Sequence, residues 1–256
     1  MSMRKYKLLT TFIFIVAAVV VLLFTGQSST KSGNHPIPKA SAPGTSKIKS
    51  LPFDITRYAT TAPSSIWVVV NKQHALNPKD YAPDDLVIPN VPLRVPGNES
   101  MRLRARTATA VEQMYAAAKI SELDLMLSSG YRSYDYQVKL YGSYVTSMGQ
   151  DKADTQSARP GYSEHQTGLA LDIEPSSRKC ELEQCFADTP EGQWLAANSY
   201  KYGFILRYTP TDVMTTGYQS EPWHFRYVGN ELATEMHKTN VATLEQFFGI
   251  SGGQDY

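Results

Sequence analysis

The sequence predicts an α+β fold with a small antiparallel sheet flanked by helices. Stretches with helical and strand-like periodicity are interspersed along residues 102–250. Near the C-terminus two strand-like stretches, GFILRY and PWHFRYV, are linked through turns, which favours an antiparallel sheet over a doubly wound parallel one. A chain of 256 residues with 42% hydrophobic composition can bury one sizeable core.

Residues 1–25 have the pattern of a membrane anchor. Three basic residues within the first seven precede an uncharged apolar run at residues 8–24. About 17 to 20 apolar residues span a bilayer, and the positive flank stays cytoplasmic. A cleaved signal peptide begins with similar charges, but the run is long and no small-x-small site follows it, which favours the anchor. The remaining chain is therefore expected to be extracytoplasmic, or secreted if the segment is cleaved.

Residues 26–63 are rich in Ser, Gly, Pro, Thr and Lys without sustained periodicity, which is typical of a flexible linker. The domain proper is expected at residues 64–250. A formal net charge of +1 lacks the basic excess of a nucleic-acid binder, so no nucleic-acid partner is expected. We expect the domain to be a monomer.

The first half of the domain is predicted to contain an extended segment, two helices and a strand. Residues 64–101 hold an apolar run, IWVVV, and then frequent prolines, so this is an extended segment with at most one strand. A helix follows from Arg102 to about Lys119, and LDLMLSSGYR is a buried strand. Ser133 caps the next helix, in which the face carrying Tyr134, Val138, Tyr141 and Val145 is apolar.

The second half is predicted to begin with a strand, LALDI, after Gly168. A helix starts at Thr189 and ends near Tyr202, before Gly203. The stretches GFILRY and PWHFRYV are strands, and NELATEMHK and VATLEQFF are the closing helices.

Two short segments carry residues suited to a metal site. His165 is seven residues before Asp172, which can point from the LALDI strand toward the loop that delivers His165. Some fifty residues later, Glu221 precedes His224 by three, and Pro222 biases Glu221 toward an extended conformation at the start of a strand. Neutral imidazole and carboxylate are ligands that suit Zn2+.

A catalytic zinc needs three protein ligands and an activated water, with a nearby carboxylate as general base. His165, Asp172 and His224 are the predicted ligands, and Glu221 is the predicted base. The alternative is a buried histidine paired with an aspartate in a polar core network. Glu164 competes for the base role, but neighbours in an extended segment point to opposite faces, so we expect Glu164 to face away from the metal and to be dispensable.

Cys180 and Cys185, the only cysteines, are five apart. Outside the cytoplasm this spacing favours a disulfide that closes a short loop over two free thiols. The C-x2-C-like spacing of a zinc site is absent.

Four motifs together resemble the zinc D-alanyl-D-alanine carboxypeptidases of the VanY type, including their L,D-carboxypeptidase branch. These are S-x-H-x-x-G-x-A-x-D at residues 163–172, E-x-W-H at residues 221–224, SGYRSYDYQ at residues 129–137, and VNKQHALNPKDYAPDDLV. The resemblance covers roughly residues 66–250. It implies the small antiparallel α+β fold shared with Hedgehog domains, a substrate in the peptidoglycan stem peptide, and the same ligand and base roles.

The resemblance also implies roles for polar residues near these motifs. Arg132 in Y-R-S would hold an anion, either the terminal carboxylate of the substrate or the oxyanion that develops during attack. Gln137, Ser163 and Ser133 would contact the peptide backbone or its carboxylate. From the residues alone, Ser133 is equally well explained as a helix cap.

The expected function is therefore removal of the terminal D-alanine from peptidoglycan stem peptides by metal-activated water, with one Zn2+ per chain. Which bond is cut stays open between D,D-carboxypeptidase, L,D-carboxypeptidase and an endopeptidase of the same fold. A non-catalytic wall-binding module on this fold is the alternative from another class. The presence of all four metal and base positions argues against it.

Overall fold

The computed structural model describes residues 53–256. The predicted anchor at residues 1–25 and residues 26–52 of the predicted linker lie outside this range. Within residues 53–256, no helix is both long and apolar enough to cross a membrane. The rest of the predicted linker packs on the domain, because Tyr58 is buried and its ring lies 4.6 Å from that of Trp67. The packed domain therefore begins before residue 64.

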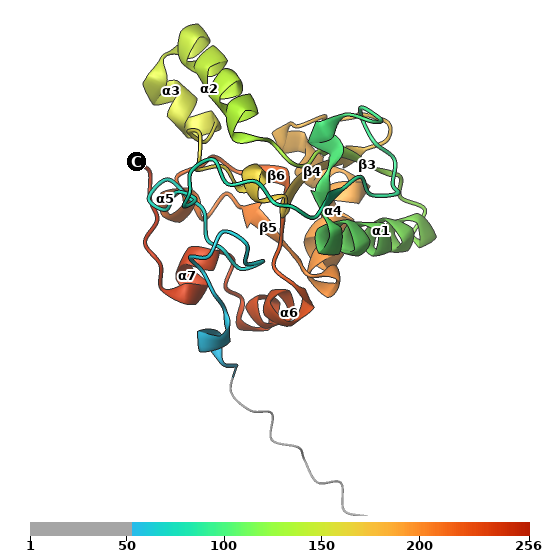
Figure 1. The fold of residues 1–256 in the computed structure, drawn as a ribbon. Coiled ribbons are helices and arrows are strands. Elements are labelled where there is room, and N and C mark those ends of the chain that lie inside the picture. The colour runs from blue at the N-terminus through green and yellow to red at the C-terminus, as the bar shows by residue number, and fades with distance from the viewer. Residues whose placement is uncertain (1–52) are drawn as a thin grey trace, which may run out of the picture. The chain divides into compact units, whose positions relative to one another are not determined.

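The predicted antiparallel sheet is confirmed (Figure 1). Its four strands lie in the order β3-β4-β6-β5, and every neighbouring pair is antiparallel. Their bounds are β3 Leu125–Ser129, β4 Ala170–Pro175, β5 Phe204–Tyr208 and β6 Glu221–Tyr227. A second sheet consists of the short strands β1 (Leu86–Val87) and β2 (Leu103–Arg104). No pattern in the sequence indicated this second sheet.

Seven α-helices surround the central sheet in the described range. They are α1 Ala105–Ile120, α2 Tyr134–Met148, α3 Gln150–Gln156, α4 Pro190–Asn198, α5 Val213–Thr216, α6 Asn230–Thr239 and α7 Leu244–Phe248. In Figure 1, α1, α4 and α6 lie beside the sheet, whereas α2 and α3 project from it as a pair, here called the arm. The helices predicted from about residues 102, 133, 189, 230 and 241 are all present.

The apolar core lies on one face of the sheet. Leu171 and Ile173 of β4 and Phe225 of β6 are fully buried, and they cluster with Val111 and Met114 of α1. Because side chains alternate along a strand, Asp172 points to the opposite face. The alternation that builds the core therefore also presents Asp172 to the site described below.

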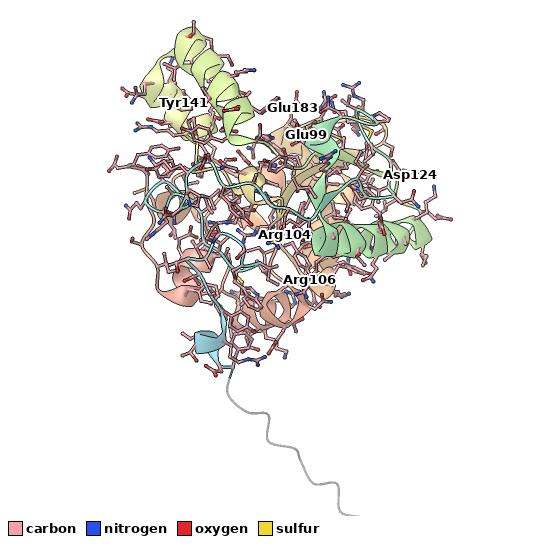
Figure 2. The ribbon with its side chains drawn as sticks, viewed as in Figure 1. Glu99, Arg104, Arg106, Asp124, Tyr141 and Glu183 are labelled. Carbon is pink, nitrogen blue, oxygen red and sulfur yellow. A yellow bond between two sulfur atoms is a disulfide. The ribbon has the colours of Figure 1, made fainter. Side chains whose placement is uncertain are left out.

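The segment at residues 64–101 holds one strand, β1, which agrees with the expectation, but two apolar stretches of the chain pack in ways that the sequence did not indicate. The IWVVV segment at residues 66–70 forms no strand; its carbonyls at Ile66 and Val68 instead accept hydrogen bonds from Arg226 (3.1 and 2.8 Å). The apolar face predicted for α2 is not a core face, because the arm stands away from the sheet and Val138 is 44% exposed. Within the arm, a polar contact joins the two helices: the hydroxyl of Tyr141, the α2 residue labelled in Figure 2, donates to Asp154 of α3 (2.7 Å).

The buried position of Phe225 predicts a large effect on stability. Phe225→Ala should lower the free energy of unfolding by about 3–5 kcal/mol, because it leaves a cavity between the sheet and α1. Ile120→Ala is the control, since that side chain is 85% exposed at the end of α1, and it should change stability by less than about 0.5 kcal/mol. Urea unfolding followed by tryptophan fluorescence measures both. Similar losses in the two variants would contradict the packing described here.

Candidate metal centre and active-site cavity

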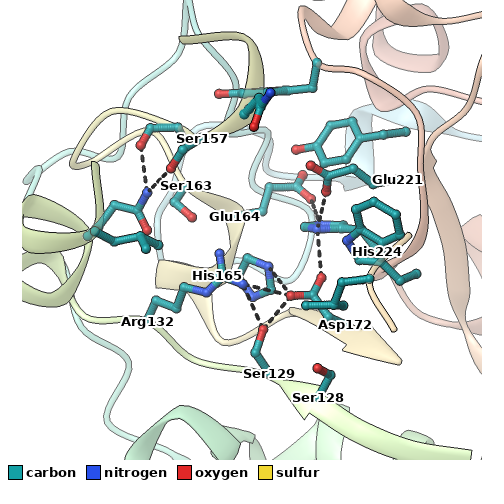
Figure 3. A pocket seen from close by; sticks show the side chains of 18 of the residues that line it. Ser128, Ser129, Arg132, Ser157, Ser163, Glu164, His165, Asp172, Glu221 and His224 are labelled. Carbon is teal, nitrogen blue, oxygen red and sulfur yellow. Dashed lines mark hydrogen bonds and ion pairs between the residues drawn. The ribbon is translucent and has the colours of Figure 1, made fainter. Parts of the chain in front are cut away.

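A cavity of about 740 Å3 opens on the polar face of the sheet. Its walls come from β3, β4 and β6, from the arm and from the loop between β4 and α4. His165, Asp172, His224, Glu221 and Arg132 all line it. Segments that lie far apart in the sequence therefore meet around one space (Figure 3).

A single turn of 3-10 helix, Glu164–Thr167, delivers His165 to the cavity. The turn ends at Gly168, which has a φ of 66°, and an added Cβ there would lie 2.8 Å from a methyl group of Leu86. Glycine is favoured at this point, because a side chain is strained at this φ. His165 Nδ1 lies 2.7 Å from the carbonyl oxygen of Gly130, so Nδ1 carries the proton and donates to it. The other ring nitrogen, Nε2, is left facing Asp172 Oδ2 at 3.5 Å.

The pairing of β4 with β6 places Asp172 directly opposite His224. His224 Nδ1 lies 3.4 Å from Asp172 Oδ1 and 3.4 Å from Glu221 Oε2. Glu221 is the first residue of β6, as predicted, and its side chain is 20% exposed, whereas those of His224 and Asp172 are almost fully buried. A carboxylate open to the cavity thus lies beside two buried ligand candidates (Figure 3).

The residues present fit a divalent metal ion. One ligand atom from each of His165, Asp172 and His224 lies within 4.8 Å of the other two. Ligand atoms of a tetrahedral zinc site lie about 2.0–2.2 Å from the ion, and hence about 3.3–3.6 Å from one another. The contacts of Asp172 with the two histidines, at 3.5 and 3.4 Å, match this spacing, although each involves a different carboxylate oxygen. Asp172 Oδ1 is buried with no hydrogen-bond partner among the described residues.

The charges around the centre also suit a cation. Burial and the nearby Arg132 lower the pKa of His165, so this imidazole is neutral at pH 7, as a metal ligand must be. Burial by itself lowers the pKa of His224, but its contacts with Asp172, Glu164 and Glu221 outweigh burial and raise that pKa well above its usual value. Three carboxylates around one imidazole are an excess of negative charge that a divalent ion can neutralise.

Arg132 lies where an anion could be held. Its Nη2 donates to Asp172 Oδ2 (2.8 Å) and to Ser129 Oγ (2.8 Å), and its side chain lines the cavity. Ser129 Oγ also donates to Asp172 Oδ2. Ser129 was not among the residues predicted from the sequence; the available signal was its place at the end of a buried strand, three residues before Arg132.

The three other polar residues predicted at the site have different environments. Gln137 is the only buried residue of α2, and its side-chain amide donates to Ser157 Oγ (3.1 Å) and to the Ala158 carbonyl (2.7 Å). Gln137 and Ser163 line the cavity. Ser133 caps α2 by accepting from the Tyr136 amide (3.2 Å) and is absent from the described lining of the cavity.

Glu164 differs from the sequence expectation. The segment around it is a 3-10 turn, not an extended strand, so the argument from alternating faces does not apply. Its side chain is 1% exposed; Oε1 accepts from Arg207 Nε (2.9 Å) and from Arg226 Nη1 (2.8 Å), and Oε2 lies 3.5 Å from His224 Nε2. Burial by itself raises the pKa of Glu164, but Arg207 and Arg226 outweigh it and hold that pKa far below its usual range. A carboxylate this acidic is a poor general base.

The two arginines belong to a buried ion network that was not predicted from the sequence. Arg207 donates through Nη1 and Nη2 to both oxygens of Glu245 on α7 (3.0 and 2.7 Å). Asn71 also donates to Glu245 (2.9 Å). The available signal was an arginine within each of two buried strands, Arg207 in FILRY and Arg226 in HFRYV, where a charge requires a partner.

Cys180 and Cys185 form a disulfide, with their Cα atoms 5.5 Å apart. The loop that they close reaches the cavity, because Leu182 and Gln184 line it. Gln184 Nε2 donates to the carbonyl of Ser220, the residue before Glu221.

A peptidase that relies on a metal needs what this centre provides: buried ligands, a free carboxylate and an open side for substrate. The chain is an enzyme of this class, a metallopeptidase. A family profile described as D-alanyl-D-alanine carboxypeptidase (VanY) matches residues 100–230. The chain belongs to the VanY family.

Individual relatives agree with this assignment. The chain is 44% identical over 187 residues to the putative carboxypeptidase YodJ of Bacillus subtilis (strain 168), an alignment that covers 73% of this chain and 68% of YodJ. A solved structure of the L,D-carboxypeptidase LdcB is 43% identical with a TM-score of 0.70, and the match covers 74% of this chain and 88% of LdcB. A vancomycin-resistance D,D-pentapeptidase VanY, solved with Zn(II), is 29% identical with a TM-score of 0.57, and the match covers 70% of this chain and 97% of that chain.

The buried ion network predicts a specific dependence of stability on pH. Burial by itself raises the pKa of Glu245, but Arg207 and Asn71 outweigh it and lower that pKa below its usual value. A lowered folded-state pKa stabilises the fold above the unfolded pKa, and this contribution is lost as the pH falls through the folded value. The wild-type protein should therefore lose more stability than Glu245→Gln between about pH 5 and pH 3.

Urea unfolding at several pH values measures this difference. Since Glu245→Gln removes the titrating group, its stability should vary less steeply over the same interval. Parallel curves for the two proteins would show that Glu245 is not charged within the network.

Proposed function

We propose that this chain is a zinc carboxypeptidase that removes the terminal D-alanine from peptidoglycan stem peptides. His165, Asp172 and His224 hold the ion, and Glu221 is the general base. The observation that carries this proposal is that Glu221, the only one of these four residues substantially open to the cavity, lies 3.4 Å from the proposed ligand atom of His224. The Zn(II) bound to a VanY relative supports zinc as the metal.

A bound zinc ion lowers the pKa of a water molecule and polarises the amide carbonyl. Glu221 takes the proton from the attacking water and returns it to the leaving amine, since a carboxylate next to the reacting atoms can serve both steps. The side chains of Asp172 and the two histidines are almost completely buried, and burial strengthens these electrostatic interactions.

Arg132 binds the anion of the substrate or of the transition state. Its guanidinium already faces Asp172 from the cavity wall, and it can donate several hydrogen bonds to a carboxylate or to a developing oxyanion. Gln137 and Ser163 lie in the same wall and can add contacts to the peptide. Ser133 serves as a helix cap in this arrangement, so we leave it out of the peptide contacts.

The bond that is cut is proposed to be the L,D bond at the end of a tetrapeptide. Among the solved structures, the L,D-carboxypeptidases LdcB and DacB are 43% and 35% identical to the chain, against 29% for the D,D-pentapeptidase. A D-alanyl-D-alanine carboxypeptidase of Enterococcus faecium is 40% identical over 136 residues, which supports the other choice. The alternative is a D,D-carboxypeptidase that acts on pentapeptides. Action on this substrate places the domain outside the cytoplasmic membrane, which agrees with the predicted N-terminal anchor.

Replacing the base should stop turnover without removing the metal. Glu221→Gln should lower kcat by about 10²–10⁴-fold, because the amide cannot take a proton from water. Zinc content, measured by mass spectrometry of the native protein, should stay at one ion per chain. Glu183→Gln, an exposed change in the disulfide loop, is the control and should retain activity. Unchanged turnover in Glu221→Gln would rule out the base role.

The choice of bond can be tested by incubating the protein with stem tetrapeptides and pentapeptides. The tetrapeptide should lose one alanine at least about tenfold faster, and a chelator should abolish the loss, with recovery on adding zinc. Faster cleavage of the pentapeptide would establish the D,D alternative. Loss of neither alanine with zinc present would exclude carboxypeptidase activity on these substrates.

A further inference from the structure

Two buried polar atoms face each other behind the proposed metal centre. Glu164 Oε2 and His224 Nε2 lie 3.5 Å apart, and neither has a hydrogen-bond partner among the described residues. Both side chains are at least 96% buried. Leaving a buried donor and a buried acceptor unpaired is costly, about 1–3 kcal/mol each. The contact between them is therefore the only pairing available to both atoms in the described part of the chain.

The other oxygen of Glu164 is fixed by two guanidinium groups. Arg207 and Arg226, both fully buried, donate to Oε1 at 2.9 and 2.8 Å. Arg226 is held in turn by the Ile66 and Val68 carbonyls. These contacts leave Glu164 few alternative positions, so Oε2 is held toward His224.

This contact favours one tautomer of His224. If Nε2 carries the proton and donates it to Glu164, Nδ1 is unprotonated and faces Asp172 and Glu221. His165 shows the mirror arrangement, with its Nδ1 bound to the Gly130 carbonyl and its Nε2 toward Asp172. The two proposed ligands would thus present different ring nitrogens to one ion, each fixed by a partner on its far side.

We propose that Glu164 is a positioning residue that accepts the Nε2 proton of His224 and thereby presents Nδ1 to the metal. This inference rests on the proposed ligand role of His224. A carboxylate behind a ligating histidine typically contributes about 10–100-fold to metal affinity. Glu164, which was expected from the sequence to be dispensable, becomes a determinant of zinc binding.

The chain offers a matched control in Glu245. Glu245 is also a buried carboxylate bound to Arg207, but its described contacts include no proposed ligand. Glu164→Gln and Glu245→Gln each remove one charge from the same network. A purely structural role of the network would make the two variants similar in every respect.

The first measurement is the zinc dissociation constant from competition with a chromophoric chelator, with thermal unfolding of the zinc-free proteins alongside. Glu164→Gln should bind zinc about 10–100-fold more weakly than the wild type, and Glu245→Gln within about threefold of it. Equal losses in the two variants, or no loss in Glu164→Gln, would overturn the inference. Absence of zinc binding in the wild-type protein would instead refute the proposed function.

The second measurement needs no variant, which keeps the inference testable if the substitutions prevent folding. In 15N-histidine-labelled wild-type protein loaded with 113Cd, the metal should couple to Nδ1 of His224 and to Nε2 of His165. His224 Nε2 should carry a slowly exchanging proton. Coupling of cadmium to His224 Nε2 would overturn the inference, because Glu164 then could not accept from that nitrogen.

Discussion

The antiparallel pairing of β4 with β6 is the constraint on which the site depends. It sets Asp172 opposite His224, and Ala170 and Leu171 opposite Arg226 and Phe225. A shift of one residue would turn Asp172 and Glu174 into the apolar core and bring Leu171 and Ile173 into the cavity. Core packing and the geometry of the metal centre are therefore fixed by the same register.

Several charged side chains are buried around this centre, and they are tolerated there because they pair with one another. Arg207 and Arg226 have no exposed surface, and Glu164 and Glu245 almost none. Isolated charges in such an environment would be strongly destabilising, but here each carboxylate accepts at least two hydrogen bonds from charged or amide donors. The network joins Glu245 of α7, Arg207 of β5 and Arg226 of β6 to one another and to Glu164 in the 3-10 turn.

The sheet forms the floor of the cavity, whereas projecting helices and a loop form its walls. The sheet supplies Asp172 and His224 from within β4 and β6, where the strand pairing fixes the backbone, and the 3-10 turn before β4 supplies His165. The arm and the disulfide loop supply the walls, including Gln137 on one side and Gln184 on the other. Because loops and projecting helices tolerate change better than sheet registers do, relatives on this fold can vary the peptide that they accept while keeping the metal centre.

The sequence by itself determined the fold class, the order of most elements and the two segments that carry the proposed ligands and the proposed base. These features follow from local rules: periodicity, helix caps, turn residues and the chemistry of neighbouring side chains. The role of Glu164, the ion network with Arg207 and Glu245, and the packing of residues 66–70 were decided only by tertiary structure. Each of these three features depends on contacts between residues that lie about 40 to 180 positions apart in the sequence. No local sequence pattern specifies which buried charged residue will pair with which partner.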